Sequence, residues 1–261
     1  MNIIKDAKRI VFKIGSSTLT HDTGRLNLER METLVRIFSD FKNAGKEIVL
    51  VSSGAVSAGI ARLKLDQRPD TIEGKQAAAA VGQSELMRMY ERFFSMYGHT
   101  VGQMLLTKDV VDSETLKHNA QNTFRALLSL GCVPIINEND SISCEELKFG
   151  GNDTLSAYVA LLCEADVLIN LSDIDGLYDS NPRTNPSAKL IQTVPVINER
   201  IFECAGGAGT ERGTGGMITK LKAAQIVCGA GIPMFILNGH NPGTLYDLFE
   251  GRSVGTYFMS N

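Results

Sequence analysis

Residues 9–17 read RIVFKIGSS, an almost continuously apolar run that ends in a glycine and two serines. A strand with one face in solvent alternates apolar and polar residues, whereas a strand covered on both faces is apolar throughout. The run therefore predicts a strand buried between two layers. Five further runs rich in Val, Ile and Leu follow the same pattern, at 47–52, 100–106, 132–137, 166–172 and 232–237.

Helix-length segments separate these runs. The clearest is NLERMETLVRIFSDFKNAG at 27–45, which ends at Gly45, a residue suited to a left-handed helix cap. Strands that alternate with helices predict an α/β fold with a mostly parallel sheet and helices on both of its sides. Ligands of such folds bind beyond the carboxyl ends of the strands.

The length and the charge of the chain limit its class of function. At 261 residues and a net charge of −3, the chain is near the upper size for one continuous core. Its acidic and basic residues are interspersed, so no basic stripe is available to bind a nucleic-acid backbone. We therefore expect one domain with two lobes, a boundary near residue 165, and no nucleic-acid partner.

The cysteines and the N-terminus indicate the compartment. The five cysteines are odd in number, widely spaced and without a C-x-x-C pair, which favours buried thiols over a disulfide framework or a zinc site. The first residues, MNIIKDAKRIVFKIGSS, lack the apolar run of a signal peptide, and no segment reaches the ~20 apolar residues of a membrane span. We expect a cytoplasmic protein with no membrane partner.

Polar and glycine-rich clusters follow four of the predicted strands, at 13–17, 52–55, 137–140 and 172–173. Gly15 and Gly54 allow backbone N–H groups to approach an anion, and a helix that begins near Ala55 points its positive end the same way. Turns between strands and helices use Ser, Asn, Asp and Gly as caps in any case. Four clusters in succession, one with a lysine, nevertheless predict a phosphate site.

Two lysines stand out because of their surroundings. Lys13 interrupts an apolar run, where a buried ammonium group needs a nearby anion. Lys220 follows a glycine-rich segment that leads into a predicted amphipathic helix within 213–232. The segment does not match the P-loop consensus, because Thr219 and not a glycine precedes the lysine. A glycine turn at a helix N-terminus still suits the phosphates of ATP.

The segment 134–157, PIINENDSISCEELKFGGNDTLSA, carries carboxylates at the edges of buried segments with few basic neighbours. Buried carboxylates are costly unless a positive charge from elsewhere in the chain meets them. We expect Asp153 to hold Lys13 and Lys220 in place and to help recruit Mg²⁺. Asp140 and Asn152 are expected to bind the amino group of a substrate. Phosphoryl transfer requires little more than positioning and positive charge.

Eight motifs resemble those of the amino acid kinase family and, within it, of the glutamate 5-kinases: VFKIGSSTLT, VSSGAVSAG, AAVGQSELM, GQMLLT, VPIINEND, FGGNDTLSA, LSDIDGLYDSNPR and GTGGMITKLKAAQ. They occur in this order and cover nearly the whole chain. The resemblance implies a three-layer αβα sandwich around an open, mostly parallel sheet. A glutamate lobe at about 1–165 would precede an ATP lobe at about 166–261.

The resemblance also implies roles for single residues. The catalytic residues would be Lys13, Asp153 and Lys220. The two lysines flank the transferred phosphate, and Asp153 holds the lysines in position. Glutamate is bound by Ser53, Asp140 and Asn152. ATP is bound by Lys13, Gly15, Ser172, Asp173, Thr214, Gly215, Gly216, Met217, Ile218, Thr219 and Lys220. No dedicated protein site for a metal is implied, and Mg²⁺ would arrive with ATP, near Asp153.

The implied reaction is the ATP-dependent phosphorylation of the γ-carboxylate of L-glutamate, the first step of proline biosynthesis. Its product, γ-glutamyl phosphate, is a labile acyl phosphate that passes to a reductase, which is thus an expected partner. We expect a homo-oligomer, either a dimer or a tetramer. Many bacterial relatives carry a C-terminal PUA domain, whereas this sequence ends at Asn261, so we expect a single kinase domain and leave inhibition by proline open.

Two alternatives stay open from the residues alone. The first is a kinase of the same fold for another small substrate, such as N-acetylglutamate, carbamate or uridylate, none of which has the free α-amino group that Asp140 would recognise. The second is a nucleotide-binding protein without turnover. Lys13, Asp153 and Lys220 argue against it, because a pure binder has no need of charge at the transferring phosphate.

Overall fold

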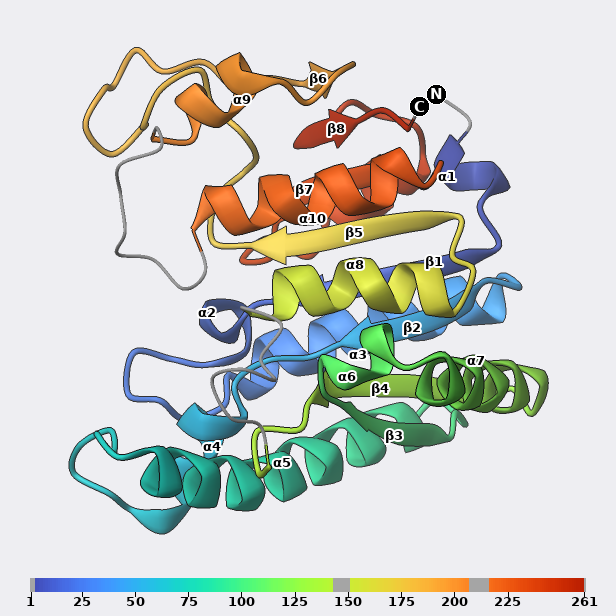
Figure 1. The fold of residues 1–261 in the computed structure, drawn as a ribbon, viewed down its shortest axis with the longest axis vertical. Coiled ribbons are helices and arrows are strands. Elements are labelled where there is room, and N and C mark those ends of the chain that lie inside the picture. Colours follow the sequence, from blue (N-terminus) through green and yellow to red (C-terminus); the bar gives the residue numbers. More distant parts are fainter. Residues whose placement is uncertain (1–2, 143–150, 207–215, 261) are drawn as a thin grey trace.

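The protein was analysed as a computed structural model that describes residues 3–142, 151–206 and 216–260 (Figure 1). Its centre is an eight-stranded sheet with the order β3-β4-β2-β1-β5-β7-β8-β6. The strands are β1 (Arg9–Ile14), β2 (Glu47–Val51), β3 (Val101–Leu106), β4 (Val133–Glu138), β5 (Val167–Ser172), β6 (Thr193–Val194), β7 (Met234–Asn238) and β8 (Thr256–Phe258). All six strands predicted from apolar runs are present.

The sheet is mostly parallel, as predicted. Strand β1 pairs with β2 and β5, and β4 pairs with β2 and β3, all in parallel. The pairs β5–β7 and β6–β8 are also parallel, whereas β7 and β8 are antiparallel. Strands β6 and β8 were not predicted, because two or three residues are too short for a recognisable periodicity. Strand β1 pairs with β2 on one side and β5 on the other, so the sheet continues across residue 165.

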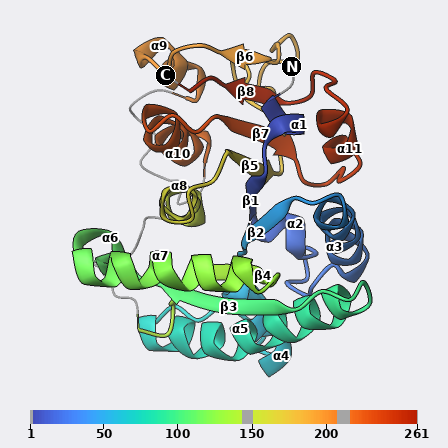
Figure 2. The ribbon, with the colours of Figure 1, turned by 90° about the vertical axis from the view of Figure 1, so that its right-hand side faces the viewer.

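Helices cover both faces of the sheet and make three layers, as Figure 2 shows for α3 and α11 on one side and α8 and α10 on the other. One apolar cluster lies between the sheet and α1, α3, α5 and α11, and a second lies against α7, α8 and α10. The helices are α1 (Ile3–Asp6), α2 (Ser16–Leu19), α3 (Leu28–Asn43), α4 (Ala55–Leu63), α5 (Ile72–Ser95), α6 (Asp109–Asp112), α7 (Glu114–Ser129), α8 (Asn152–Leu162), α9 (Glu199–Cys204), α10 (Met217–Gly229) and α11 (Thr244–Phe249).

Helix α3 illustrates how the sequence determines these elements. Its N-cap, Asn27, accepts a hydrogen bond from the backbone N–H of Arg30 at 3.0 Å. Met31, Leu34 and Phe38 follow at helical spacing and are fully buried against the sheet, which stabilises the fold by roughly 1.5–3 kcal/mol for each side chain. The chain then turns through Gly45, whose φ is +90°, as expected for a left-handed position.

The hairpin of α4 and α5 packs backbone against backbone. A Cβ on Gly59 would lie 1.7 Å from the carbonyl oxygen of Ala78, and a Cβ on Gly82 would lie 1.8 Å from that of Ala55. No side chain is compatible with such approaches, so glycine is required at both positions. This contact fixes α5 against α4, and the first turn of α4 follows the carboxyl end of β2.

The four cysteines within the described ranges, Cys132, Cys163, Cys204 and Cys228, are free thiols. Cys144 lies outside the described residues. In the part of the chain that the structure describes, no helix combines the length and the apolar composition needed to cross a membrane.

Candidate active site

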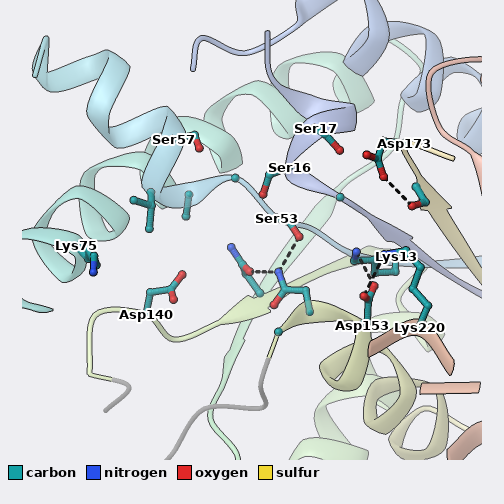
Figure 3. Close-up of a pocket in the computed structure, with 18 of the residues that line it drawn as sticks. Lys13, Ser16, Ser17, Ser53, Ser57, Lys75, Asp140, Asp153, Asp173 and Lys220 are labelled. Atoms are coloured by element: carbon teal, nitrogen blue, oxygen red, sulfur yellow. Dashed lines mark hydrogen bonds and ion pairs between the residues drawn. The ribbon is translucent and has the colours of Figure 1, made fainter. Parts of the chain in front are cut away.

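The predicted polar clusters converge on one cavity of about 750 Å³ at the carboxyl edge of the sheet (Figure 3). It lies beyond the ends of β1, β2, β4 and β5, and the first turns of α4, α8 and α10 also contribute to it. We call it the acceptor cavity. The predicted site residues that line it are Lys13, Gly15, Ser53, Asp140, Asn152, Asp153, Ser172, Asp173 and Lys220.

Lys13, Asp153 and Lys220 form a buried ionic group, which we call the charge centre. The Nζ atom of Lys13 lies 2.6 Å from Oδ1 of Asp153, and that of Lys220 lies 3.2 Å from Oδ2. The three residues are 7%, 3% and 5% exposed, respectively. Strand β1, helix α8 and helix α10 each supply one of them, so residues far apart in sequence meet as predicted.

The Asp153 carboxylate accepts two further hydrogen bonds. Asn170, on β5, donates its Nδ2 to Oδ1 at 2.8 Å, and the hydroxyl of Thr219, in the first turn of α10, donates to Oδ2 at 2.6 Å. An ionised carboxylate has about four acceptor positions in all. Lys13, Lys220, Asn170 and Thr219 occupy them, so Asp153 holds the two ammonium groups and has no acceptor position left for a metal ion.

The charge centre shifts the titration of its own members. Burial alone would raise the pKa of the Asp153 carboxyl, but the charges of Lys13 and Lys220 and hydrogen bonds from Lys13 and Thr219 outweigh it and hold that pKa well below its usual range. Burial lowers the pKa of the Lys13 ammonium; Asp153 opposes this in part, and the charge of Lys220 lowers the pKa further. The carboxylate is therefore ionised at neutral pH.

A neutral network lies beside the charge centre, and we call it the amide floor. The Nδ2 of Asn152 donates to the backbone oxygen of Ser52 at 2.6 Å, to Oγ of Ser53 at 2.9 Å and to Oδ1 of Asn137 at 2.9 Å. Asn137 in turn donates its Nδ2 to Oε1 of Gln83 at 2.8 Å. Because the nitrogen of Asn152 is committed to the protein, its amide oxygen remains as an acceptor for a ligand.

A second cavity of about 520 Å³ adjoins the first and shares Ser172, Asp173 and Lys220 with it. Its wall includes Gly216 and Met217 from the start of α10. We call it the nucleotide cavity. Lys220 lines both cavities, whereas Lys13 and Asp153 line the acceptor cavity.

Asp173 lines both cavities, and Gly15 lines the acceptor cavity. Asp173 forms an ion pair with Arg183 at 3.3 Å at the surface. A Cβ on Gly15 would lie at ordinary contact distance, 3.6 Å from the nearest protein atom. Protein packing therefore does not require glycine there. The backbone N–H of Gly15 donates to the carbonyl oxygen of Leu171 at 3.3 Å, and its contact with a nucleotide stays a prediction.

The remaining predicted ATP-binding residues have different outcomes. Thr219 is in the first turn of α10 and contacts Asp153, while Ile218 lines neither cavity. Thr214 and Gly215 lie outside the described residues.

The comparison with known proteins agrees with this geometry. The sequence model of the amino acid kinase family matches residues 8–238. A glutamate 5-kinase of Clostridium perfringens (strain 13 / Type A) is 54% identical over 261 residues, which cover 98% of this chain and 97% of that protein. The chain belongs to the amino acid kinase family.

A second curated relative and a solved structure are also similar to this amino acid kinase. A glutamate 5-kinase of Clostridium tetani (strain Massachusetts / E88) is 54% identical over 255 residues, or 98% of this chain and 96% of that protein. The crystal structure of UMP kinase from Bacillus anthracis has a TM-score of 0.65 at 17% identity and covers 98% of this chain and 97% of that one. Similarity at this low identity concerns the fold alone, and it confirms the α/β class.

Several polar residues of this amino acid kinase site were not predicted as site residues, and three of them show why. Asn170 interrupts a buried strand with an amide, as Lys13 does with an ammonium group, so the same signal was available for it. Gln83 is a buried amide on an otherwise apolar helix face. Lys75, in the first turn of α5, lines the acceptor cavity but reads in sequence as an ordinary surface lysine of an alanine-rich helix.

Proposed function

We propose that this chain transfers the γ-phosphoryl group of ATP to the γ-carboxylate of L-glutamate, the first step of proline biosynthesis. The observation that carries the proposal is the charge centre, which lines the acceptor cavity and reaches the adjoining cavity through Lys220. One cavity suits a nucleotide and the other a small acid. The product is γ-glutamyl phosphate.

Stabilisation of the moving phosphoryl group comes from the two lysines. ATP bound in the nucleotide cavity directs its phosphates toward Lys220 and Lys13, while the acceptor carboxylate approaches from the other side. A lysine about 4 Å from a phosphate charge contributes on the order of 4 kcal/mol at an effective dielectric near 20. Asp153 keeps both ammonium groups oriented before the substrates arrive, so little reorganisation is needed during the reaction.

Magnesium enters the proposal with the nucleotide. Among the described residues, no group of three His, Cys, Asp or Glu side chains is arranged to hold a metal ion. Protein donors already occupy the acceptor positions of Asp153, so its carboxylate does not fit a resident Mg²⁺ ion. That the Mg²⁺ of ATP lies near Asp153 stays a prediction. Mg²⁺ carried in with ATP would neutralise part of the negative charge of the phosphates beside Lys13 and Lys220.

Recognition of glutamate is assigned to the amide floor and to Asp140. The amide oxygen of Asn152 and the carboxylate of Asp140 both accept hydrogen bonds from an ammonium group. The hydroxyl of Ser53, which accepts from Asn152 at 2.9 Å, retains its own proton to donate to a substrate oxygen. These groups favour a free α-amino group, which N-acetylglutamate and carbamate lack.

The proposal also covers the lobes of the chain, its oligomeric state and its partner protein. We propose that residues 1–165 form the glutamate lobe and residues 166–261 the ATP lobe of one kinase domain. A cytoplasmic homo-oligomer, a dimer or a tetramer, and a reductase that consumes the acyl phosphate also belong to the proposal.

Hydroxylamine trapping tests the reaction. The protein with ATP, Mg²⁺ and L-glutamate should yield the γ-hydroxamate, because hydroxylamine attacks an acyl phosphate. Parallel reactions contain N-acetylglutamate, carbamate or UMP in place of glutamate, with ADP release as the common readout. Release of ADP with a rival substrate but not with glutamate would contradict the proposal, as would nucleotide binding without turnover of any of them.

A further inference from the structure

The acceptor cavity has cations at both of its ends. The charge centre occupies the end next to the nucleotide cavity. Lys75, in the first turn of α5, lies toward the other end (Figure 3), and Arg68, in the loop before that helix, also lines the cavity. Figure 3 shows Lys75 and Asp140 on one side and Lys13, Asp153 and Lys220 on the other, with Ser53 between them.

The position of Lys75 is determined by local structure. Thr71, the N-cap of α5, accepts a hydrogen bond from the backbone N–H of Gly74 at 3.1 Å. Gly74 packs so closely on Pro69 that a Cβ there would lie 2.7 Å from the ring. The backbone contact between α4 and α5 fixes the helix as a whole. Lys75 is half-buried and makes no ion pair with the residues that the structure describes.

The nucleotide is an unsuitable partner for Lys75. Its cavity meets the acceptor cavity at Ser172, Asp173 and Lys220, so phosphate groups enter at the charge centre. The opposite end receives the part of the acceptor that lies farthest from the reacting carboxylate. A cation at that end favours an acceptor with a second negative group.

We propose that Lys75, with Arg68 at the rim, binds the α-carboxylate of the acceptor and makes the site specific for dicarboxylic α-amino acids. The inference rests on the proposed function. Along the cavity, hydrogen-bond donors and acceptors alternate. The ammonium groups of the charge centre come first, then the acceptors Asn152 and Asp140, and then the ammonium group of Lys75. The γ-carboxylate, the α-ammonium group and the α-carboxylate of glutamate alternate in the complementary order.

The test compares L-glutamate with its α-amide, isoglutamine, which keeps the γ-carboxylate and the ammonium group but has no α-carboxylate. For Lys75→Met, kcat/KM for glutamate should fall roughly ten- to hundredfold, mainly through KM, because one charge-assisted hydrogen bond is lost. Isoglutamine should be used about as well as by the unaltered protein, within roughly threefold. The preference for glutamate should therefore largely disappear, and Lys75→Arg should restore part of it.

The matched control is Lys64→Met. Lys64 is exposed at the end of α4, on the same hairpin, and does not line the cavity, so its loss should leave the preference unchanged. An equal fall for both substrates in Lys75→Met, or the same change in Lys64→Met, would overturn the assignment while leaving the proposed function intact. If the unaltered protein does not phosphorylate glutamate, the proposed function fails and the inference fails with it.

Discussion

The charge centre and the amide floor lie side by side at the same sheet edge, yet they are built differently. The charge centre buries one carboxylate between two ammonium groups. The amide floor uses uncharged groups, with Gln83, Asn137 and Asn152 joined by hydrogen bonds of 2.8 and 2.9 Å. Both satisfy their buried polar atoms, but by different means.

The difference follows from what each region has to do. A buried ion pair gives little net stability, because the desolvation of its charges offsets their attraction. The charge centre is therefore better explained by the proposed phosphoryl transfer, in which negative charge would move past Lys13 and Lys220. Neutral amides are less costly to bury, and they suffice where a substrate only has to be oriented. Damage to the first region should thus lower kcat, and damage to the second should raise KM.

The largest effect is expected for Asp153→Asn. The substitution leaves Lys13 and Lys220 buried without their anion, which should lower kcat by about a thousandfold or more and destabilise the fold by about 3–5 kcal/mol. Steady-state ADP release and urea unfolding measure the two effects. Thr154→Ala serves as the control, because Thr154 is a half-buried residue of the same helix whose side chain forms no hydrogen bond with the described charge centre. A variant of Asp153 with kcat within tenfold of the unaltered protein would show that the lysines need no organising carboxylate.

Lys13→Met should have the next largest effect. It distinguishes a role in stabilising the transferred phosphoryl group, which affects kcat, from a role in binding glutamate, which affects KM. Loss of one cation at the transferring phosphate should lower kcat by about a hundredfold, while KM for glutamate changes by less than about threefold. Lys13→Arg keeps the charge and should retain more activity. If KM rose and kcat stayed constant, Lys13 would belong to recognition and the contrast between the two regions would be wrong.

Gln83→Met should give the opposite pattern at a smaller size. Gln83 touches no substrate; it acts through Asn137, whose Nδ2 would lose its buried acceptor, at a cost of about 1–3 kcal/mol. Asn152 would then be less well oriented, so we expect KM for glutamate to rise about tenfold with kcat nearly unchanged. Gln83→Glu keeps an oxygen acceptor and should recover part of the affinity. A fall in kcat without a change in KM would remove Gln83 from substrate recognition.

The sequence predicted the strands and the charge centre well for a physical reason. A lysine inside the apolar run of β1 requires an anion, and Asp153 lacked a nearby cation, so each charge implied the other. Gln83 and Asn137 carry no such signal. An amide tolerates burial with many partners, and the two residues are 54 positions apart. Their contact depends on how α5 packs beside β4, which local sequence patterns do not specify.

Two other failures have different causes. Strands β6 and β8 are too short to produce a periodicity. Tertiary pairing forms them, because β8 pairs with β7 and β6 pairs with β8. Lys75 was overlooked because a lysine in the first turn of an exposed helix is common. The backbone contact between α4 and α5 and the packing of Gly74 on Pro69 position that turn, and neither contact is evident from the sequence.

The smallest expected effect is on the pH dependence of kcat/KM. It distinguishes the charge centre from the amide floor, because only the charge centre contains ionisable side chains. The pKa of Lys13 lies below the ordinary value of 10.5, since burial disfavours its charged form. In the free enzyme, kcat/KM should therefore fall on an alkaline limb centred below pH 10.5, and Lys13→Arg should move that limb to higher pH.

The sign for stability is opposite to that for activity. Between the folded and unfolded pKa values of Lys13, the unfolded chain binds more protons, so this group makes the fold more stable as pH rises. Activity should thus decline while circular dichroism still reports a folded protein. An alkaline limb that coincides with unfolding, or one that Lys13→Arg leaves in place, would assign the titration to another group.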